Sequence, residues 1–296
     1  MSTATTTDAA RTVSRRQFLQ VSALAAAGGL VAYAGFWDRH DLELIEQTIR
    51  LRRLPEAFHG LRIAQVSDIH YDEFTEPYFV REVVRRVNAL HPDIVVLTGD
   101  FVTDGPLPRR VGARLSYPCA EILSGIRCPH RFASLGNHDT LVGSAVVVDA
   151  LKVQGIPTLV DNHIPFERDG GRLWFAGLRS SLEETPQLED ALPRQAGPTE
   201  PVILLAHEPD YALQVVKRGV VDLMLSGHTH GGQIRLPFIG TPRPLLAKGG
   251  RLFVHGHFNV GPMQLYVNRG IGTVKLPVRF HCPPELTLIT LQPAES

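Results

Sequence analysis

The chain has 296 residues, and its 30 lysines and arginines balance 30 aspartates and glutamates, so the formal net charge is zero. Hydrophobic residues make up 44% and charged residues 20%, the proportions of an ordinary globular protein. This composition excludes a disordered chain, a collagen-like repeat and a polytopic membrane protein. A neutral chain also lacks the basic face of a nucleic-acid-binding protein, so we expect no nucleic-acid binding.

The N-terminal segment resembles a twin-arginine export signal. Arg15 and Arg16 stand shortly before Phe18 and a weakly polar run that ends at Phe36. This pattern predicts the twin-arginine export machinery as a partner and a periplasmic, cell-envelope or membrane-anchored location outside the cytoplasm. An amphipathic helix is the alternative, but the run has no charged face. Cleavage after Ala34 and retention as a membrane anchor both stay open, because the 19 residues from 18 to 36 are within reach of spanning a bilayer.

We therefore divide the chain into a signal peptide or membrane anchor at 1–36 and a single domain at 37–296. Residues 42–51 alternate loosely and predict a first strand. Short apolar runs of the kind found in strands buried on both faces then recur along the domain. Each run ends in polar residues: LRIAQV (61–66) before SDIH, IVVLT (94–98) before GD, FASL (132–135) before GNHD, VILLA (202–206) before H, and DLML (222–225) before SGHTH.

Helical patterns lie between several of these runs. Apolar residues at 80, 83, 84, 87 and 90 share one face of a helix that begins just after Pro77. Segments 146–153 and 211–216 predict two more helices. The alternation predicts an α/β fold with a largely parallel core, in which ligands bind beyond the carboxyl ends of the strands. Each of the five apolar runs is followed by Asp, Asn or His, so these residues are expected at the carboxyl edge of the sheet.

The polar residues at that edge form a candidate metal site. Oxygen and imidazole ligands without thiolates suit Mn²⁺, Fe²⁺ or Zn²⁺. Seven ligands are too many for one ion and suit two divalent ions that share a carboxylate. Such a pair, roughly 3.5–4 Å apart, activates a bridging water and stabilises in-line displacement at phosphorus. The candidate ligands are Asp68, His70, Asp100, Asn137, His207, His228 and His230, with His138 beside them.

These motifs, in this order, resemble the calcineurin-like metallophosphoesterase superfamily. The stretches GHTHGGQIRLP, QLYVNRGIGT and PPELTLITL are similar to its twin-arginine-exported bacterial branch. That branch includes phosphodiesterases and enzymes that act on a UDP-diacylglucosamine pyrophosphate. The resemblance covers about residues 42–293. It implies a four-layer α/β/β/α metallophosphoesterase sandwich with two facing mixed sheets.

The resemblance also implies roles for the site residues. A metal-bridging hydroxide would be the nucleophile, and His138 would be the general acid that protonates the leaving alkoxide, a role that suits an imidazole of near-neutral pKa. Asp139 either orients His138 or is a turn residue. The implied ligand sets are bridged by Asp100: Asp68, His70 and His230 for one ion, and Asn137, His207 and His228 for the other.

The sequence thus predicts a dinuclear-metal-dependent phosphoester hydrolase, in the first place a phosphodiesterase or pyrophosphohydrolase. The Pro-, Gly- and apolar-rich segment 233–262 follows His230 directly and, together with the N-terminal apolar run, points to a membrane-associated substrate such as a lipid phosphodiester or UDP-glycolipid. Packing of that segment on the domain is the alternative. A phosphomonoesterase would use the same metal centre and stays open. A non-catalytic metal-binding scaffold is disfavoured, because all eight site positions are present.

Other polar residues lead to less specific predictions. Arg179 stands where members of this superfamily often carry an acidic pair, and it either contacts an anion or lies in a solvated loop. The His255-Gly256-His257 sequence predicts a surface hairpin rather than a metal pair. Three cysteines are too few for a disulfide framework. Cys119 and Cys128 either form a disulfide with each other or are two free thiols in the core.

Overall fold

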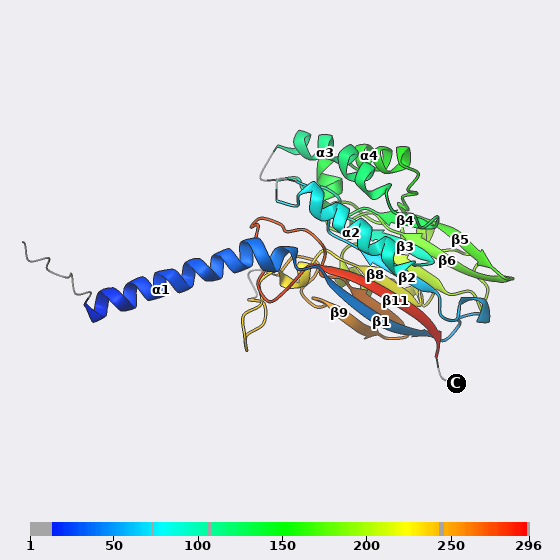
Figure 1. Ribbon diagram of the computed structural model, residues 1–296. Helices are drawn as coiled ribbons and strands as arrows, with labels where there is room; N and C mark the ends of the chain where they lie inside the picture. Colours follow the sequence, from blue (N-terminus) through cyan, green and yellow to red (C-terminus); the bar gives the residue numbers. More distant parts are fainter. Residues whose placement is uncertain (1–13, 73, 106–107, 243–245, 295–296) are drawn as a thin grey trace, which may run out of the picture.

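The computed structural model describes residues 14–72, 74–105, 108–242 and 246–294. Residues 1–13 of the predicted signal and 243–245 of the 233–262 segment lie outside the described residues. Within the described part, the chain forms two β-sheets that pack face to face, with helices on the outer face of each sheet (Figure 1). The α/β prediction and the four-layer sandwich of two mixed sheets are confirmed.

The first sheet contains three of the five predicted apolar runs as parallel neighbours. Its other two strands are parallel to each other, and one of them joins the three runs as an antiparallel neighbour. In spatial order, the described strands are β1 (Glu43–Leu51), β11 (Glu285–Pro293), β2 (Arg62–Val66), β3 (Ile94–Thr98) and β4 (Arg131–Ser134).

The second sheet contains the other two predicted runs, again as parallel neighbours. Its two edge strands are antiparallel to the strands beside them. In spatial order, the described strands are β5 (Asn162–Arg168), β6 (Gly171–Gly177), β7 (Val202–Leu205), β8 (Leu223–Ser226), β10 (Met263–Val267) and β9 (Gly256–Val260).

The strands are nearly all apolar because both of their faces are covered. Side chains such as Val96 of β3 and Leu225 of β8 form a core between the sheets. Helices cover the outer face of the first sheet: α2 (Pro77–Leu90), α3 (Arg109–Leu123) and α4 (Asn137–Val153). The outer face of the second sheet carries loops and short helices: α5 (Leu188–Ala191), 3₁₀ Pro209–Tyr211, α6 (Ala212–Val215) and 3₁₀ Val216–Arg218.

The predicted elements are present, with some differences in extent. The helix after Pro77 is α2, segment 146–153 is the second half of α4, and 211–216 is a helical turn flanked by 3₁₀ turns. The helix α3 and the β5–β6 hairpin have no counterpart among the predictions. Helix α3 contains Pro118 in its interior, and because an interior proline disfavours a helix, the sequence pattern did not predict this one.

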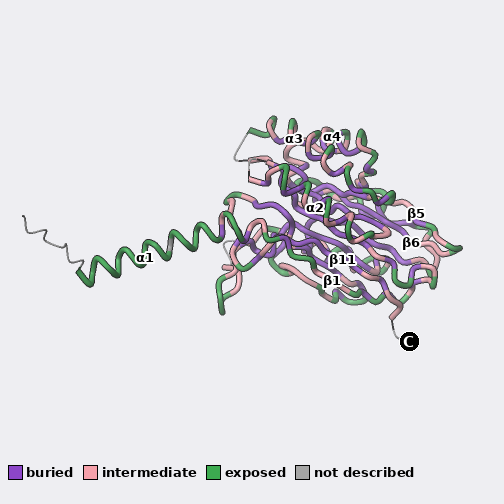
Figure 2. Tube along the Cα trace, in the orientation of Figure 1, coloured by how far each residue is buried: buried purple, intermediate pink, exposed green. Residues whose placement is uncertain are grey.

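The N-terminal helix α1 (Arg15–Ala32) extends away from the sandwich, and its described side chains are exposed (Figure 2). Ser14 caps its first turn by accepting a hydrogen bond from the backbone N–H of Gln17. The helix continues through a π-turn (Tyr33–Trp37) and a 3₁₀ turn (Asp38–His40). By length and composition the span Arg15–His40 could cross a membrane, a property that cleaved signal sequences share.

Candidate metal centre

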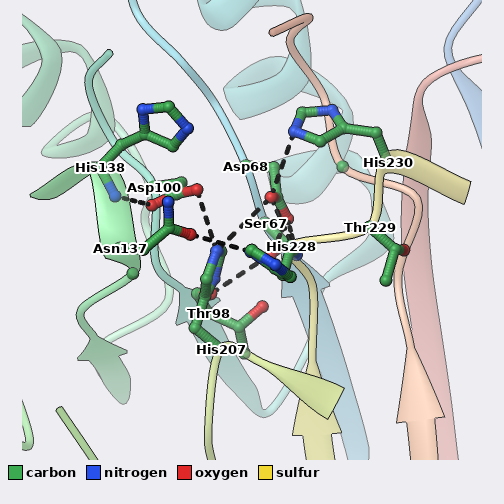
Figure 3. Close-up of polar contacts among 12 residues, drawn as sticks. Ser67, Asp68, Thr98, Asp100, Asn137, His138, His207, His228, Thr229 and His230 are labelled. Carbon is green, nitrogen blue, oxygen red and sulfur yellow. Dashed lines mark hydrogen bonds and ion pairs between the residues drawn. The ribbon is translucent and has the colours of Figure 1, made fainter. Parts of the chain in front are cut away.

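Polar loops at the carboxyl ends of β2, β3, β4, β7 and β8 meet at one edge of the sandwich (Figure 3). The structure brings together the seven predicted ligands and His138, although their strands belong to two different sheets. Five of these residues have left-handed backbone conformations, which are uncommon outside glycine and concentrate at functional sites. They are Asp68, His70, Asp100, His228 and His230, with φ between 46° and 72°.

Glycines in the motifs make room for the carboxylates. A Cβ atom at Gly136 would overlap Asp100 Oδ1, and one at Gly227 would overlap Asp68 Oδ2. The loops can therefore close tightly around both carboxylates. Backbone N–H groups then fix the carboxylate positions, because Asp100 Oδ1 accepts from His138 and Asp68 Oδ1 accepts from His228, each at 2.9 Å.

The ligand atoms form two adjoining groups. In the first, His230 Nε2 lies 3.0 Å from His70 Nε2 and 3.4 Å from Asp68 Oδ1. In the second, His207 Nε2 lies 2.9 Å from Asp100 Oδ2. Asp100 Oδ2 is also 3.5 Å from His70 Nε2, so this carboxylate lies between the two groups. The remaining contact joins Asn137 Oδ1 to His228 Nδ1 at 2.8 Å.

The outward nitrogens of these histidines are held by hydrogen bonds, which leaves the inward nitrogens for another partner. His207 Nδ1 donates to the Thr98 carbonyl at 2.6 Å, and His228 Nε2 donates to the Lys248 carbonyl at 2.7 Å. Such bonds orient metal-binding imidazoles and fix their tautomer. The inward His207 Nε2 is buried without a hydrogen-bond partner among the described residues. It faces the Asp100 carboxylate instead, at 2.9 Å. This convergence of imidazole nitrogens and carboxylates fits divalent cations.

Burial and neighbouring charges set the protonation of the buried histidines. Burial and the nearby His138 lower the pKa of His70 well below its usual value, and burial and Arg279 do the same to the pKa of His230. Both rings are therefore neutral, the form that binds metals. Burial alone would also lower the pKa of His207, but the facing carboxylates of Asp100 and Asp68 outweigh it and raise that pKa.

The carboxylate that contacts His138 is Asp104, not the Asp139 considered from the sequence. His138 Nδ1 lies 2.6 Å from Asp104 Oδ1, so Asp104 orients the ring. Asp139 is instead a backbone clamp that caps α4, and reading it as the residue that orients His138 was wrong. Its carboxylate accepts four backbone N–H groups: those of Asp100 at 2.8 Å, Phe101 at 2.9 Å, Gly136 at 2.9 Å and Val102 at 3.4 Å.

The family model for calcineurin-like phosphoesterases matches residues 61–232, more than half of the chain. The chain belongs to this family. It is therefore a metallophosphoesterase, a phosphoester hydrolase of a family that depends on two metal ions, and its buried cluster contains the candidate metal-binding residues.

Three relatives are similar over nearly their whole length. An uncharacterized metallophosphoesterase YkuE of Bacillus subtilis is 34% identical, over 95% of this chain and 98% of that protein. The phosphodiesterase YaeI of Escherichia coli is 31% identical, over 94% and 99%. The UDP-2,3-diacylglucosamine pyrophosphatase LpxG of Chlamydia muridarum is 30% identical, over 86% and 91%.

A pocket of about 360 Å³ adjoins the candidate metal site of this phosphoesterase. His228 and His230 form part of its wall. Apolar and cationic side chains make up most of the rest, so the pocket can accept a group that is both apolar and anionic. They are Ile234, Leu246, Val274 and Leu276 on the apolar side, and Lys248, Arg251 and Lys275 on the cationic side.

No sequence motif predicted a role for Arg279, although its side chain is fully buried beside the candidate metal site. The guanidinium donates to the carbonyls of Gly270, Gly272 and Cys282, and it lies 3.4 Å from His230 Nδ1. These contacts tie Gly272 to Cys282 and so close the loop 273–278 behind His230, a candidate metal ligand. No local pattern distinguishes this arginine from a solvated one.

The remaining predictions concern residues outside the cluster. Arg179 forms ion pairs with Asp161 and Glu184, as expected of a loop arginine. The hairpin prediction at 255–257 is confirmed, because β9 pairs antiparallel with β10. All three cysteines lie in the described part of the chain and are buried free thiols, so Cys119 and Cys128 are core residues rather than a pair.

Proposed function

We propose that this enzyme is a phosphodiesterase or pyrophosphohydrolase that acts on a membrane-associated substrate, such as a lipid phosphodiester or a UDP-linked glycolipid. The observation that carries the proposal is the pocket beside His228 and His230, which combines apolar and cationic walls. The name of one relative, a phosphodiesterase, supports the reaction class, and the name of another, a UDP-2,3-diacylglucosamine pyrophosphatase, supports a UDP-linked glycolipid as substrate. A phosphomonoester lacks the second substituent that such a pocket would bind.

In this proposal the metal ions are Mn²⁺, Fe²⁺ or Zn²⁺. They would neutralise charge on the phosphate and provide an activated water as nucleophile. Asp68, His70 and His230 would hold one ion, Asn137, His207 and His228 would hold the other, and Asp100 would contribute to both.

His138 supplies the proton for the leaving oxygen. Because Asp104 accepts the Nδ1 proton, the imidazole presents Nε2–H as the acidic group. His138 is close enough to act there, since its ring nitrogen lies within 4.8 Å of the ligand atoms of His70 and Asp100. Lys248 and Lys275 bind the second anionic group of the substrate in the adjoining pocket.

We further propose that residues 1–36 are a twin-arginine signal or anchor and that residues 37–296 act outside the cytoplasm. Ser14, Arg15, Arg16 and Phe18 support this assignment together with the apolar helix that follows them. A twin-arginine substrate folds before export, so the metal cluster would form in the cytoplasm.

The first test compares a diester with a monoester. The full chain is purified in detergent, stripped of metal, and assayed on bis(p-nitrophenyl) phosphate and p-nitrophenyl phosphate with Mn²⁺, with Zn²⁺ or without metal. We expect metal-dependent diester cleavage that Asp100→Asn abolishes and that Asp149→Asn, a surface control, retains. Preference for the monoester would identify a phosphomonoesterase instead.

The second test addresses the lipid. UDP-diacylglucosamine and a phospholipid in vesicles are compared with short water-soluble diesters. Higher kcat/KM on the lipid substrates supports the proposal. If the short diesters are cleaved at least as efficiently, the membrane-associated substrate is wrong while the hydrolase assignment stands.

A further inference from the structure

The π-turn that follows α1 is packed against the sandwich at Ala34, the candidate cleavage point. Ala34 is buried, and its carbonyl accepts the backbone N–H of Arg279 at 3.0 Å. Gly35 lies close to Val278, since a Cβ atom added to Gly35 would be 3.8 Å from the Val278 side chain. Proteolysis favours exposed, flexible loops, whereas this segment is helical and partly buried. The folded chain therefore protects the bond after Ala34.

The residues that follow fix the direction of α1 relative to the sandwich. Arg39 donates to the Phe74 carbonyl at 2.6 Å and to Glu76 at 2.7 Å. His40 contacts the same Glu76 carboxylate at 3.0 Å. These contacts leave no free linker between α1 and the sandwich, so a membrane around α1 would meet one defined face of the body.

Exposed apolar side chains lie on that face. Phe238 is fully exposed, Ile239 is 72% exposed and Leu276 is 55% exposed. The Gln233 side chain joins the two loops that carry them, because it donates to the Leu276 carbonyl at 2.9 Å. In Figure 1 the yellow and orange loops protrude on the side from which α1 leaves the body.

The surrounding residues match the interface of a bilayer with anionic lipids. Tyr33, Phe36 and Trp37 are exposed at the end of α1, where membrane helices carry aromatic residues at the headgroup level. Lys248 and Lys275 line the nearby pocket, and basic residues near a membrane surface are attracted to anionic headgroups. Both features favour a lipid surface over a protein partner.

We propose that α1 is retained as a membrane anchor and that this face, the loop 236–240 with Leu276, rests on the same bilayer. The pocket beside His228 and His230 then opens at the membrane surface. A lipid-linked phosphoester can keep its acyl chains in the bilayer while its phosphorus reaches the metal cluster. The membrane contact itself does not depend on the proposed hydrolysis and is tested without it.

The contact is measured with a fluorophore on the full chain in phosphatidylcholine vesicles that contain a minor fraction of phosphatidylglycerol. The native cysteines are buried, so an environment-sensitive dye attaches to a single introduced cysteine. Phe238→Cys tests the loop, and Val153→Cys, which is 66% exposed on α4, is the matched control. We expect a blue-shifted emission that nitroxide lipids quench for the loop label and neither effect for the control.

Two outcomes of that measurement would overturn the proposal. The first is a loop label as accessible to a water-soluble quencher as the control label. The second is a blue shift that nitroxide lipids leave unchanged and that grows with protein concentration, which would identify a second copy of the chain as the occupant. Intact mass of the exported protein gives a separate readout. A chain that still contains α1 supports the anchor, and a chain that begins at Gly35 overturns it.

Discussion

Replacing Asp104 by asparagine removes one charge beside His138 and keeps the shape of the side chain. Burial by itself lowers the pKa of His138, but the carboxylates of Asp100 and Asp104 outweigh burial and raise that pKa. His138 is protonated, and can act as the acid, at any pH below this raised pKa. It loses the proton as pH rises through the pKa. Asp104→Asn lowers the pKa of His138, so the alkaline limb of the rate profile moves to lower pH.

The size of the effect follows from the contact. A hydrogen bond to a charged group contributes about 1.5–3 kcal/mol, which corresponds to roughly 10- to 150-fold in rate if the whole contribution is lost from the transition state. The Asp104 side chain is 22% exposed, so solvent screening places the expected loss toward the lower end. Removing the acid altogether, in His138→Ala, costs about 10²- to 10⁴-fold.

The assay compares two leaving groups on the same diester framework. An alkoxide needs a proton to leave, whereas p-nitrophenolate leaves readily without one. Asp104→Asn therefore reduces kcat strongly for the alkyl diester and weakly for the p-nitrophenyl diester. Asp149→Asn, which removes an exposed charge next to the Tyr117 hydroxyl, is the control. Equal losses for both leaving groups, or none, would refute the acid role of His138.

Three further predictions concern the architecture of the cluster. Asp139→Asn places an amide donor against backbone donors, so we expect the free energy of unfolding in urea to fall by about 1–3 kcal/mol. Gly227→Ala overlaps Asp68, so elemental analysis should find less bound metal than in Gly105→Ala, where an added Cβ contacts no described atom within 4 Å. Chelation removes a ligand of the folded state, so Tm falls, and restoring metal at 100 times its Kd stabilises the fold by about 2.7 kcal/mol.

The candidate metal site could be predicted because the pattern that marks each of its residues is local in the sequence. Each ligand candidate directly follows a strand that is buried on both faces, and such strands appear in the sequence as continuous apolar runs. Parallel strands bring their carboxyl ends to one edge, so His207 and His228 meet without any further signal. The division of the strands over two sheets does not follow from this pattern, and only the family resemblance implied it.

Residues that act across long sequence distances could not be predicted. Asp104 lies in a loop with no periodic pattern, and its contact with His138 spans 34 residues. Arg279 lies 49 residues from His230, and its burial depends on carbonyls that the folded loops provide. In both cases the side chain is typical of a solvated surface, and only the tertiary structure shows what it contacts.

The fate of the N-terminal segment is linked to the metal cluster through one of these residues. A cleaved signal and a retained anchor have the same apolar composition, so the sequence does not separate them. The difference lies at Ala34, whose carbonyl accepts the backbone N–H of Arg279. Cleavage after Ala34 would remove this acceptor, and such a hydrogen bond contributes about 0.5–1.5 kcal/mol. Because the Arg279 guanidinium holds the loop at Gly270 and Gly272 beside His230, cleavage would loosen the support of a metal-ligand candidate.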